Sequence, residues 1–131
     1  SPQDEQRYWR GLAGFNEERV ALDAADKAFS EFRNQDASSI LGLLSTNATT
    51  GPSVWRLMTS RWDEALAKFP PNTLAYMTLG IRTFINDAAF ADEVEAFHTS
   101  HPLSGEQKTV QQNIERMRVG LTFSGAMRDQ L

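Results

Sequence analysis

The chain has 131 residues, a length that suits one compact domain or a part of a larger one. It lacks cysteine, which excludes disulfides, thiolate catalysis and cysteine–zinc sites and favours a cytoplasmic location. Its 13 basic and 17 acidic residues are interspersed and give a net charge of -4. No basic stripe is present, so we expect no nucleic acid as a partner. No basic amphipathic helix or long apolar run is present either, so we expect no membrane as a partner.

Helical periodicity dominates the chain, and the alternating β-branched runs that are typical of strands are almost absent. The first predicted helix covers residues 2–14. The second covers 17–31 and carries a stripe of alanines, which indicates close packing between helices. The third covers 35–45 and is followed by a loop over 47–52 that is rich in Thr, Asn, Gly and Pro. The fourth predicted helix covers 52–69 and ends at two consecutive prolines.

Three more helices are predicted in the second half of the chain. They cover residues 73–85, 88–99 and 105–124 or beyond, and Asp87 is placed to cap the second of these. The last four helices each have one apolar face. The residues expected on those buried faces are Trp55, Met58, Trp62, Leu66, Phe69, Leu74, Met77, Ile81, Phe84, Phe90, Ala91, Val94, Phe97, Val110, Ile114, Met117 and Leu121.

Seven helices joined by short loops predict an all-α fold in which antiparallel neighbours pack together. We favour an α-α superhelix of HEAT-like or armadillo-like antiparallel helix pairs, since seven helices are too many for one simple bundle. A plain helical bundle is the alternative.

One group of residues has the spacing of metal ligands. Glu95, His98 and His101 form Glu-x-x-His-x-x-His, and on a continuous helix they would lie near one face. Pro102 indicates that the helix ends at His101, so we expect no metal here. The zinc-protease motif His-Glu-x-x-His and the nucleophile motif Gly-x-Ser-x-Gly are both absent, and no catalytic residue is predicted.

Two other features were weighed as binding sites. The aromatic residues Trp55, Trp62 and Phe69 recur at helical spacing and are interpreted as core. The turn before the third helix presents Arg33 and Asp36, and an arginine there is able to contact a ligand carboxylate. The preferred interpretation is that Asp36 caps the helix while Arg33 is solvated or pairs with a neighbouring helix.

Five segments in order resemble the C-terminal domain of aminopeptidase N-like enzymes, a group that includes puromycin-sensitive aminopeptidase and the endoplasmic-reticulum aminopeptidases. The segments cover almost the whole chain. They are residues 2–8 (PQDEQRY), 32–36 (FRNQD), 55–63 (WRLMTSRWD), 97–102 (FHTSHP) and 108–116 (KTVQQNIER).

The chain departs from the pattern of these enzymes at three places. Arg61 stands where Asn usually precedes the Trp, His98 replaces a Phe, and Gly120 stands where Asn is common. The stretch over 68–72 is similar to bacterial members, which implies a bacterial origin.

The resemblance implies that residues 1–131 are a single fragment of the C-terminal helical domain of a larger zinc aminopeptidase. Such a domain is non-catalytic and predicted to be inactive alone. It closes over the catalytic domain of the same enzyme and lines a chamber for peptide substrates. The fragment itself needs no cofactor, and the zinc belongs to the parent enzyme. Arg33 is the residue that we expect on the substrate side.

Two other functions stay open from the residues alone. One is a free-standing helical-repeat module that binds another protein. The other is a small enzyme that uses Glu95, His98 and His101 with a bound metal.

Overall fold

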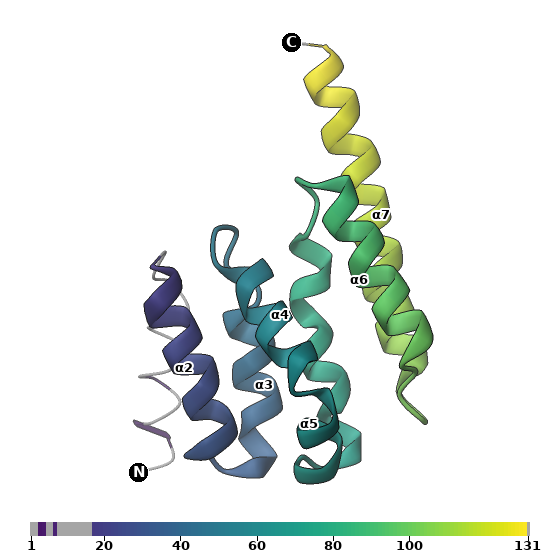
Figure 1. Cartoon of the computed structure of the whole chain (residues 1–131). Coiled ribbons are helices and arrows are strands. Elements are labelled where there is room, and N and C mark those ends of the chain that lie inside the picture. The colour runs from purple at the N-terminus through teal and green to yellow at the C-terminus, as the bar shows by residue number, and fades with distance from the viewer. Residues whose placement is uncertain (1–2, 5–6, 8–16, 131) are drawn as a thin grey trace.

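The computed structural model describes residues 3–4, 7 and 17–130 (Figure 1). These residues form helices and contain no strand, which confirms the predicted all-α class. Most of the first predicted helix, 2–14, lies outside the described residues. The elements described are α2 (Glu18–Ser30), α3 (Asn34–Leu44), α4 (Gly51–Ser60), α5 (Trp62–Lys68), the 3-10 helix η1 (Pro71–Thr83), α6 (Ala88–Ser100) and α7 (Gln107–Asp129).

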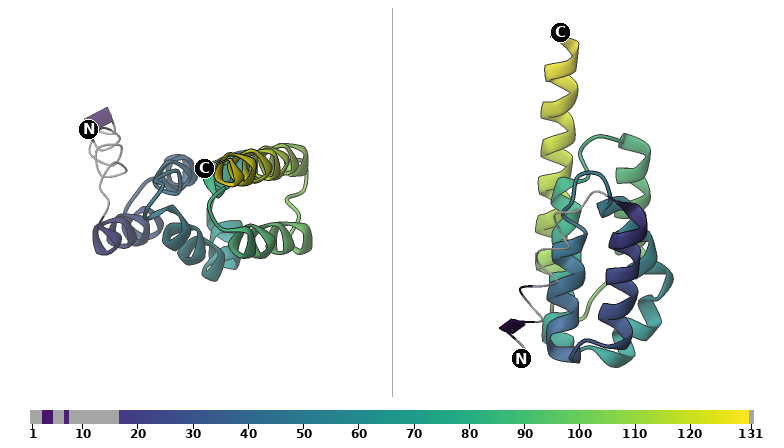
Figure 2. Two further views of the ribbon diagram at one scale, coloured as in Figure 1. Left: turned by 90° about the horizontal axis from the view of Figure 1, so that it is seen from above. Right: turned by 90° about the vertical axis from the view of Figure 1, so that its left-hand side faces the viewer.

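The helices stack in two layers (Figures 1 and 2). Seen from above, α2, α4 and α6 lie in one row and α3 and α7 in the other. In the second row, η1 packs against both α3 and α7, while α2 packs against α4 in the first. Apart from α5, which continues in the direction of α4, consecutive helices run in opposite directions, and α2 with α3 and α6 with α7 form pairs across the layers. This arrangement confirms the predicted superhelix of antiparallel helix pairs.

The space between the layers is filled by the predicted apolar faces. The alanine stripe of α2 is buried against its neighbours, and Phe29 at its end is fully buried. Of the aromatic residues interpreted as core, Trp55, Trp62 and Phe69 are each 5% exposed or less. The core interpretation of this stripe is therefore confirmed.

The prediction of one continuous helix over 52–69 is wrong, because the helix breaks at Arg61. The backbone of Arg61 has φ -117° and ψ 28°, which is outside the helical region. Just before the break, the hydroxyls of Thr59 and Ser60 donate hydrogen bonds to backbone carbonyls three or four residues earlier. Such bonds compete with the helical ladder and bend helices. Leu66, predicted on the buried face, is 43% exposed beyond the break.

The fifth predicted helix, 73–85, is wound as the 3-10 helix η1 over Pro71–Thr83. Thr73, Thr78 and Thr83 each donate a hydroxyl hydrogen bond to the carbonyl three residues earlier. β-branched residues and glycine also have low α-helical propensity. The tighter winding nevertheless keeps the predicted apolar residues Leu74 and Ile81 buried.

Two glycines let η1 lie unusually close to α3. A Cβ added to Gly42 would collide with the backbone carbonyl of Tyr76, and one added to Gly80 would collide with Ser45. Because backbone atoms cannot move aside cheaply, a side chain at either position would force the helices apart. The contact between α3 and η1 therefore depends on residues without a side chain.

The last helix, α7, continues past residue 124, as the prediction allowed, and ends at Asp129. Its C-terminal half projects beyond the other elements (Figures 1 and 2). Three apolar residues on this half, Val119, Phe123 and Met127, are between 51% and 70% exposed. Among the described residues, no helix combines the length and apolarity needed to cross a membrane.

Candidate functional site

The residues with metal-ligand spacing are directed to different partners. Glu95 accepts a hydrogen bond from Nε of Arg118 at 2.7 Å. The His101 ring stacks on Phe97 with ring centroids 4.1 Å apart, and its Nδ1 lies 2.9 Å from the carbonyl oxygen of Phe97. His98 is buried in the core at 1% exposure. In the described part of the chain, no three His, Cys, Asp or Glu side chains are arranged to hold a metal ion.

His98 is the most unusual polar group in the core. Its Nε2 accepts a hydrogen bond from Nε1 of Trp55 at 3.0 Å, so the neutral ring carries its proton on Nδ1. Nδ1 is buried and has no hydrogen-bond partner among the described residues. Burial, and to a lesser extent the charge of His101, lowers the pKa of His98 from 6.5 to about 4. The ring is therefore neutral at pH 7, and with Nε2 occupied it is not available as a metal ligand.

Aromatic rings surround this histidine. The ring of Trp55 lies edge-on to Phe90 and Phe97, and Trp62 lies edge-on to Phe97. These contacts join α4 and α5 to α6 across the first layer. Edge-to-face pairs of this kind contribute about 0.5–1.5 kcal/mol each beyond burial. The cluster therefore connects the helices of the first layer. A surface pocket that includes Trp62 and Phe97 is also lined by Thr59, Ser60, Arg61, Asp63, Glu64 and His101.

Arg33 lies at the turn between α2 and α3, where the sequence places it. Its Nε donates to Oδ2 of Asp36 at 3.1 Å, and its side chain is half exposed. The predicted capping role of Asp36 is wrong: the helix begins at Asn34, and Asp36 is in the first turn, where it complements the helix dipole. The observed ion pair is thus local and is not made with a neighbouring helix.

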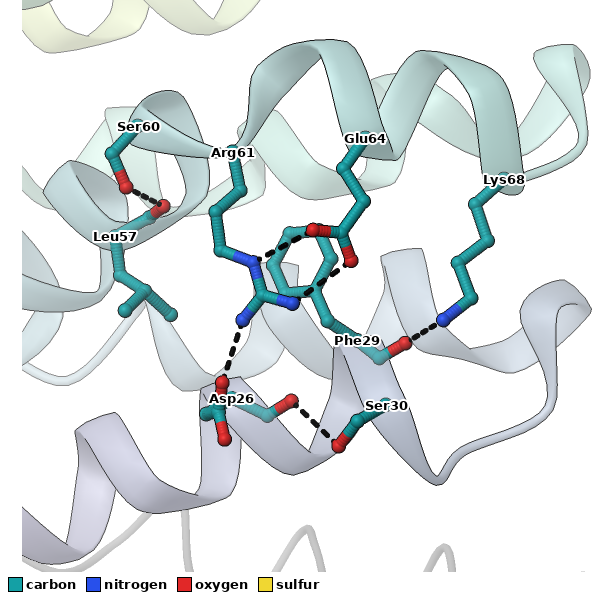
Figure 3. A network of polar contacts seen from close by, with 8 residues as sticks. All are labelled: Asp26, Phe29, Ser30, Leu57, Ser60, Arg61, Glu64 and Lys68. Carbon is teal, nitrogen blue, oxygen red and sulfur yellow. Dashed lines mark hydrogen bonds and ion pairs between the residues drawn. The ribbon is translucent and has the colours of Figure 1, made fainter.

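A stronger arginine contact lies at the break between α4 and α5 (Figure 3). The guanidinium of Arg61 binds Glu64 through two nitrogens, at 3.1 and 2.8 Å, and Asp26 through a third at 2.7 Å. It also lies over the ring of Phe29, 4.2 Å from the centroid. The hydrogen bonds that Arg61 donates, above all to Glu64, raise the pKa of Arg61, and the hydrogen bond from Arg61 lowers the pKa of Glu64.

This contact joins α2 to α5, and Lys68 reinforces it by donating to the backbone carbonyl of Phe29 (Figure 3). Sequence reasoning missed it, noting Arg61 only as a departure from a family pattern. The partners Asp26 and Arg61 are 35 residues apart, and no local spacing marks them. The network is a structural clamp, since each of its groups is engaged by another part of the chain.

Two further surface pockets lie on the second layer and on α7. One lies along the projecting half of α7 and is almost wholly apolar, lined by Arg118, Val119, Thr122, Phe123 and Ala126. The other lies between η1, α7 and the end of α3, and is lined by Thr46, Leu79, Arg82, Thr83 and Arg116. Among the described residues that line these two pockets there is no carboxylate or histidine. The pocket at Trp62 does contain such groups, in Asp63, Glu64 and His101, and Glu64 is bound to Arg61.

Comparison with known proteins identifies the family of the chain. The family model of the ERAP1-like C-terminal domain matches residues 1–119. The chain is 29% identical over 118 residues to the protein named Aminopeptidase M1-A of Oryza sativa subsp. japonica, an alignment that covers 89% of this chain and 13% of that protein. No solved structure matches the chain significantly. Both matches relate the chain to the C-terminal domain of M1-type aminopeptidases, and the chain belongs to the ERAP1-like C-terminal domain family.

Proposed function

We propose that the chain is a non-catalytic part of the C-terminal domain of a zinc aminopeptidase that removes N-terminal residues from peptides. In this proposal, residues 1–131 belong to a larger helical domain of HEAT-like type, and the enzyme is located in the cytoplasm. The observation that carries the proposal is the family match over residues 1–119, which includes nearly all the described helices. The chain spans about 13% of the length of the rice aminopeptidase that it matches.

The zinc of this proposed enzyme is held outside the described residues. Glu95, His98 and His101 do not fit zinc, because each is engaged by another residue and His98 is buried. In this proposal the residues described here take no part in the hydrolysis itself. Their contribution is to the shape of the enzyme and to contacts with its catalytic domain.

Within that enzyme, the array closes and lines the substrate chamber. A two-layered helical array presents one long face on each side, which suits the wall of a chamber. Arg33 is the residue that we propose on the substrate side. Its side chain is half exposed at a turn between the layers, and only one of the guanidinium's five donors is used by Asp36.

The experiment uses the full-length enzyme and peptides of increasing length. We expect that deletion of the segment that corresponds to residues 17–130 abolishes the preference of the enzyme for peptides of a particular length. Arg33→Ala should raise KM for long peptides by several-fold while kcat for an amino-acid anilide stays unchanged, because the anilide is too short to reach the array. Arg19→Ala, an exposed arginine on α2, is the matched control. An unchanged KM at every length would remove Arg33 from the proposal.

The exposed stripe on α7 favours a second function, a free-standing module that binds another protein. Val119, Phe123 and Met127 lie one turn apart on the projecting half of the helix. Exposed apolar stripes mark interaction surfaces in many proteins. The genomic reading frame separates the two functions, since only the first requires that the frame continue upstream into a His-Glu-x-x-His motif.

A further inference from the structure

Two arginines from different helices line one surface pocket in the second layer. Arg82 is near the end of η1, Arg116 is on α7, and Thr46 follows the end of α3. The pocket thus forms where η1 meets its two neighbours. These residues are far apart in the sequence, and only the folded array brings them together.

The charges of this pocket are not balanced by the residues that the structure describes. Neither guanidinium forms a hydrogen bond or an ion pair with another described residue, and the described lining of the pocket contains no carboxylate. By contrast, Arg61 and Arg118 each bind two carboxylates. Two guanidinium groups that share one pocket repel each other, and a bound anion would turn that repulsion into attraction.

The pocket offers a ligand hydrogen-bond donors mainly from its arginines. The hydroxyl of Thr46 donates to the carbonyl of Leu43 at 2.6 Å, and that of Thr83 donates to the carbonyl of Gly80 at 2.7 Å. Their protons are therefore already used. Planar guanidinium groups match the two oxygens of a carboxylate or phosphate group, so an oxyanion is the ligand that this donor set selects.

The 3-10 winding of η1 adds an apolar approach to this pocket. Residues three apart lie above one another in a 3-10 helix, which places Tyr76, Leu79 and Arg82 in one row. Tyr76 is 57% exposed and Leu79 is 39% exposed. The row leads from an aromatic ring through an aliphatic side chain to the first guanidinium. A ligand with an apolar body and an anionic end fits this order.

We propose that Arg82 and Arg116 form an oxyanion-binding site for a carboxylate or phosphate group, with Leu79 contacting the apolar part of the ligand that carries it. The site depends only on the folded array and not on the catalytic role of any other part of the enzyme.

The test is calorimetric titration of the 131-residue chain with three probes. They are inorganic phosphate, a short peptide that ends in leucine with a free carboxylate, and the same peptide with an amidated end. We expect at least one anion to bind with a millimolar or tighter Kd. Preference for the peptide acid over both the amide and phosphate identifies a carboxylate, and preference for phosphate identifies a phosphate group.

Variants connect the binding to the two arginines. Arg82→Gln or Arg116→Gln should weaken binding of the preferred anion by about tenfold or more, and Arg82→Lys by less, because lysine keeps the charge but not the planar fork. Arg19→Gln makes the same charge change on α2, which does not line the pocket, and should leave the Kd unchanged. Both arginines of the pocket are exposed, so circular dichroism should show intact helices in every variant.

Three results would overturn the proposal. The first is the absence of millimolar binding of phosphate and of the peptide acid. The second is binding that is equal in the wild type and in both glutamine variants. The third is equally tight binding of the peptide acid and the peptide amide without binding of phosphate, which would show that the carboxylate is not recognised.

Discussion

Trp55 and His98 form a hydrogen-bonded pair in the core, with the indole Nε1 of α4 donating to the imidazole Nε2 of α6 at 3.0 Å. Both side chains are buried, at 3% and 1% exposure. The pair leaves His98 with one unpartnered nitrogen among the described residues, and the rings of Trp55 and Trp62 lie edge-on to the imidazole. The stability of the array is therefore expected to depend on the protonation of this single ring.

The first prediction concerns pH. The pKa of His98 is about 4 in the folded chain and about 6.5 when unfolded, so the unfolded state binds the proton first as pH falls. The contribution of the neutral His98 ring to the free energy of unfolding is complete above pH 6.5 and is lost progressively as the pH falls to 4. At about pH 5 the loss amounts to roughly 2 kcal/mol of unfolding free energy. Urea denaturation over this pH range measures the free energy of unfolding of the wild type and of His98→Phe. The same dependence of this free energy on pH in both proteins would contradict the prediction.

The second prediction concerns the Trp55–His98 pair itself. Trp55→Phe should destabilise the chain by about 2–4 kcal/mol, because it leaves a cavity and removes the partner of Nε2. His98→Phe leaves the indole N–H without an acceptor. The double variant removes both polar groups, so its loss should be smaller than the sum of the two single losses by about 1–2 kcal/mol. Additive losses in a double-mutant cycle would show that the hydrogen bond does not couple the two helices.

The third prediction concerns the clamp between α2 and α5. Arg61→Ala should lower the free energy of unfolding by about 1–2 kcal/mol through loss of its contact with Phe29 and of two ion pairs. Asp26 is 59% exposed, so the ion pairs contribute the smaller part. Arg33→Ala removes one exposed pair and should cost under about 0.5 kcal/mol. Equal losses in the two variants would contradict the special role of Arg61.

The fourth prediction concerns close packing of α3 against η1. Gly42→Ala should destabilise the chain by about 2 kcal/mol or more, because the new methyl group meets the backbone of Tyr76. Gly125→Ala on α7 meets no atom and should stabilise the helix by up to about 1 kcal/mol. Thermal denaturation of the two variants gives shifts of opposite sign if this account is right. A Gly42→Ala variant with an unchanged melting temperature would mean that η1 is free to move away from α3.

The helices were predictable because their apolar stripes recur with the helical period and their ends carry local signals. Asp87 illustrates such a signal, since its side chain accepts a hydrogen bond from the backbone of Phe90 as the cap of α6. The break at Arg61 and the 3-10 winding of η1 were not predictable. They depend on hydroxyl bonds to the backbone and on close contact with α3, which leave the apolar pattern unchanged.

The candidate sites were less predictable than the helices. His98 was singled out as a possible metal ligand, but its partner Trp55 is 43 residues away and is found only in the folded array. The pocket of Arg82 and Arg116 carries no local motif for the same reason. Arg33 was selected by resemblance to a family pattern, and its contact with substrate stays a prediction, as does the bacterial origin.

The most direct test of the central claim is aminopeptidase activity on a chromogenic amino-acid anilide with zinc added, measured for the 131-residue chain and for the full-length parent protein. We predict chelator-sensitive activity in the parent and none above background in the chain alone, because the proposed function places the catalytic zinc in another part of the parent protein. Robust, chelator-sensitive activity of the chain alone would contradict the account.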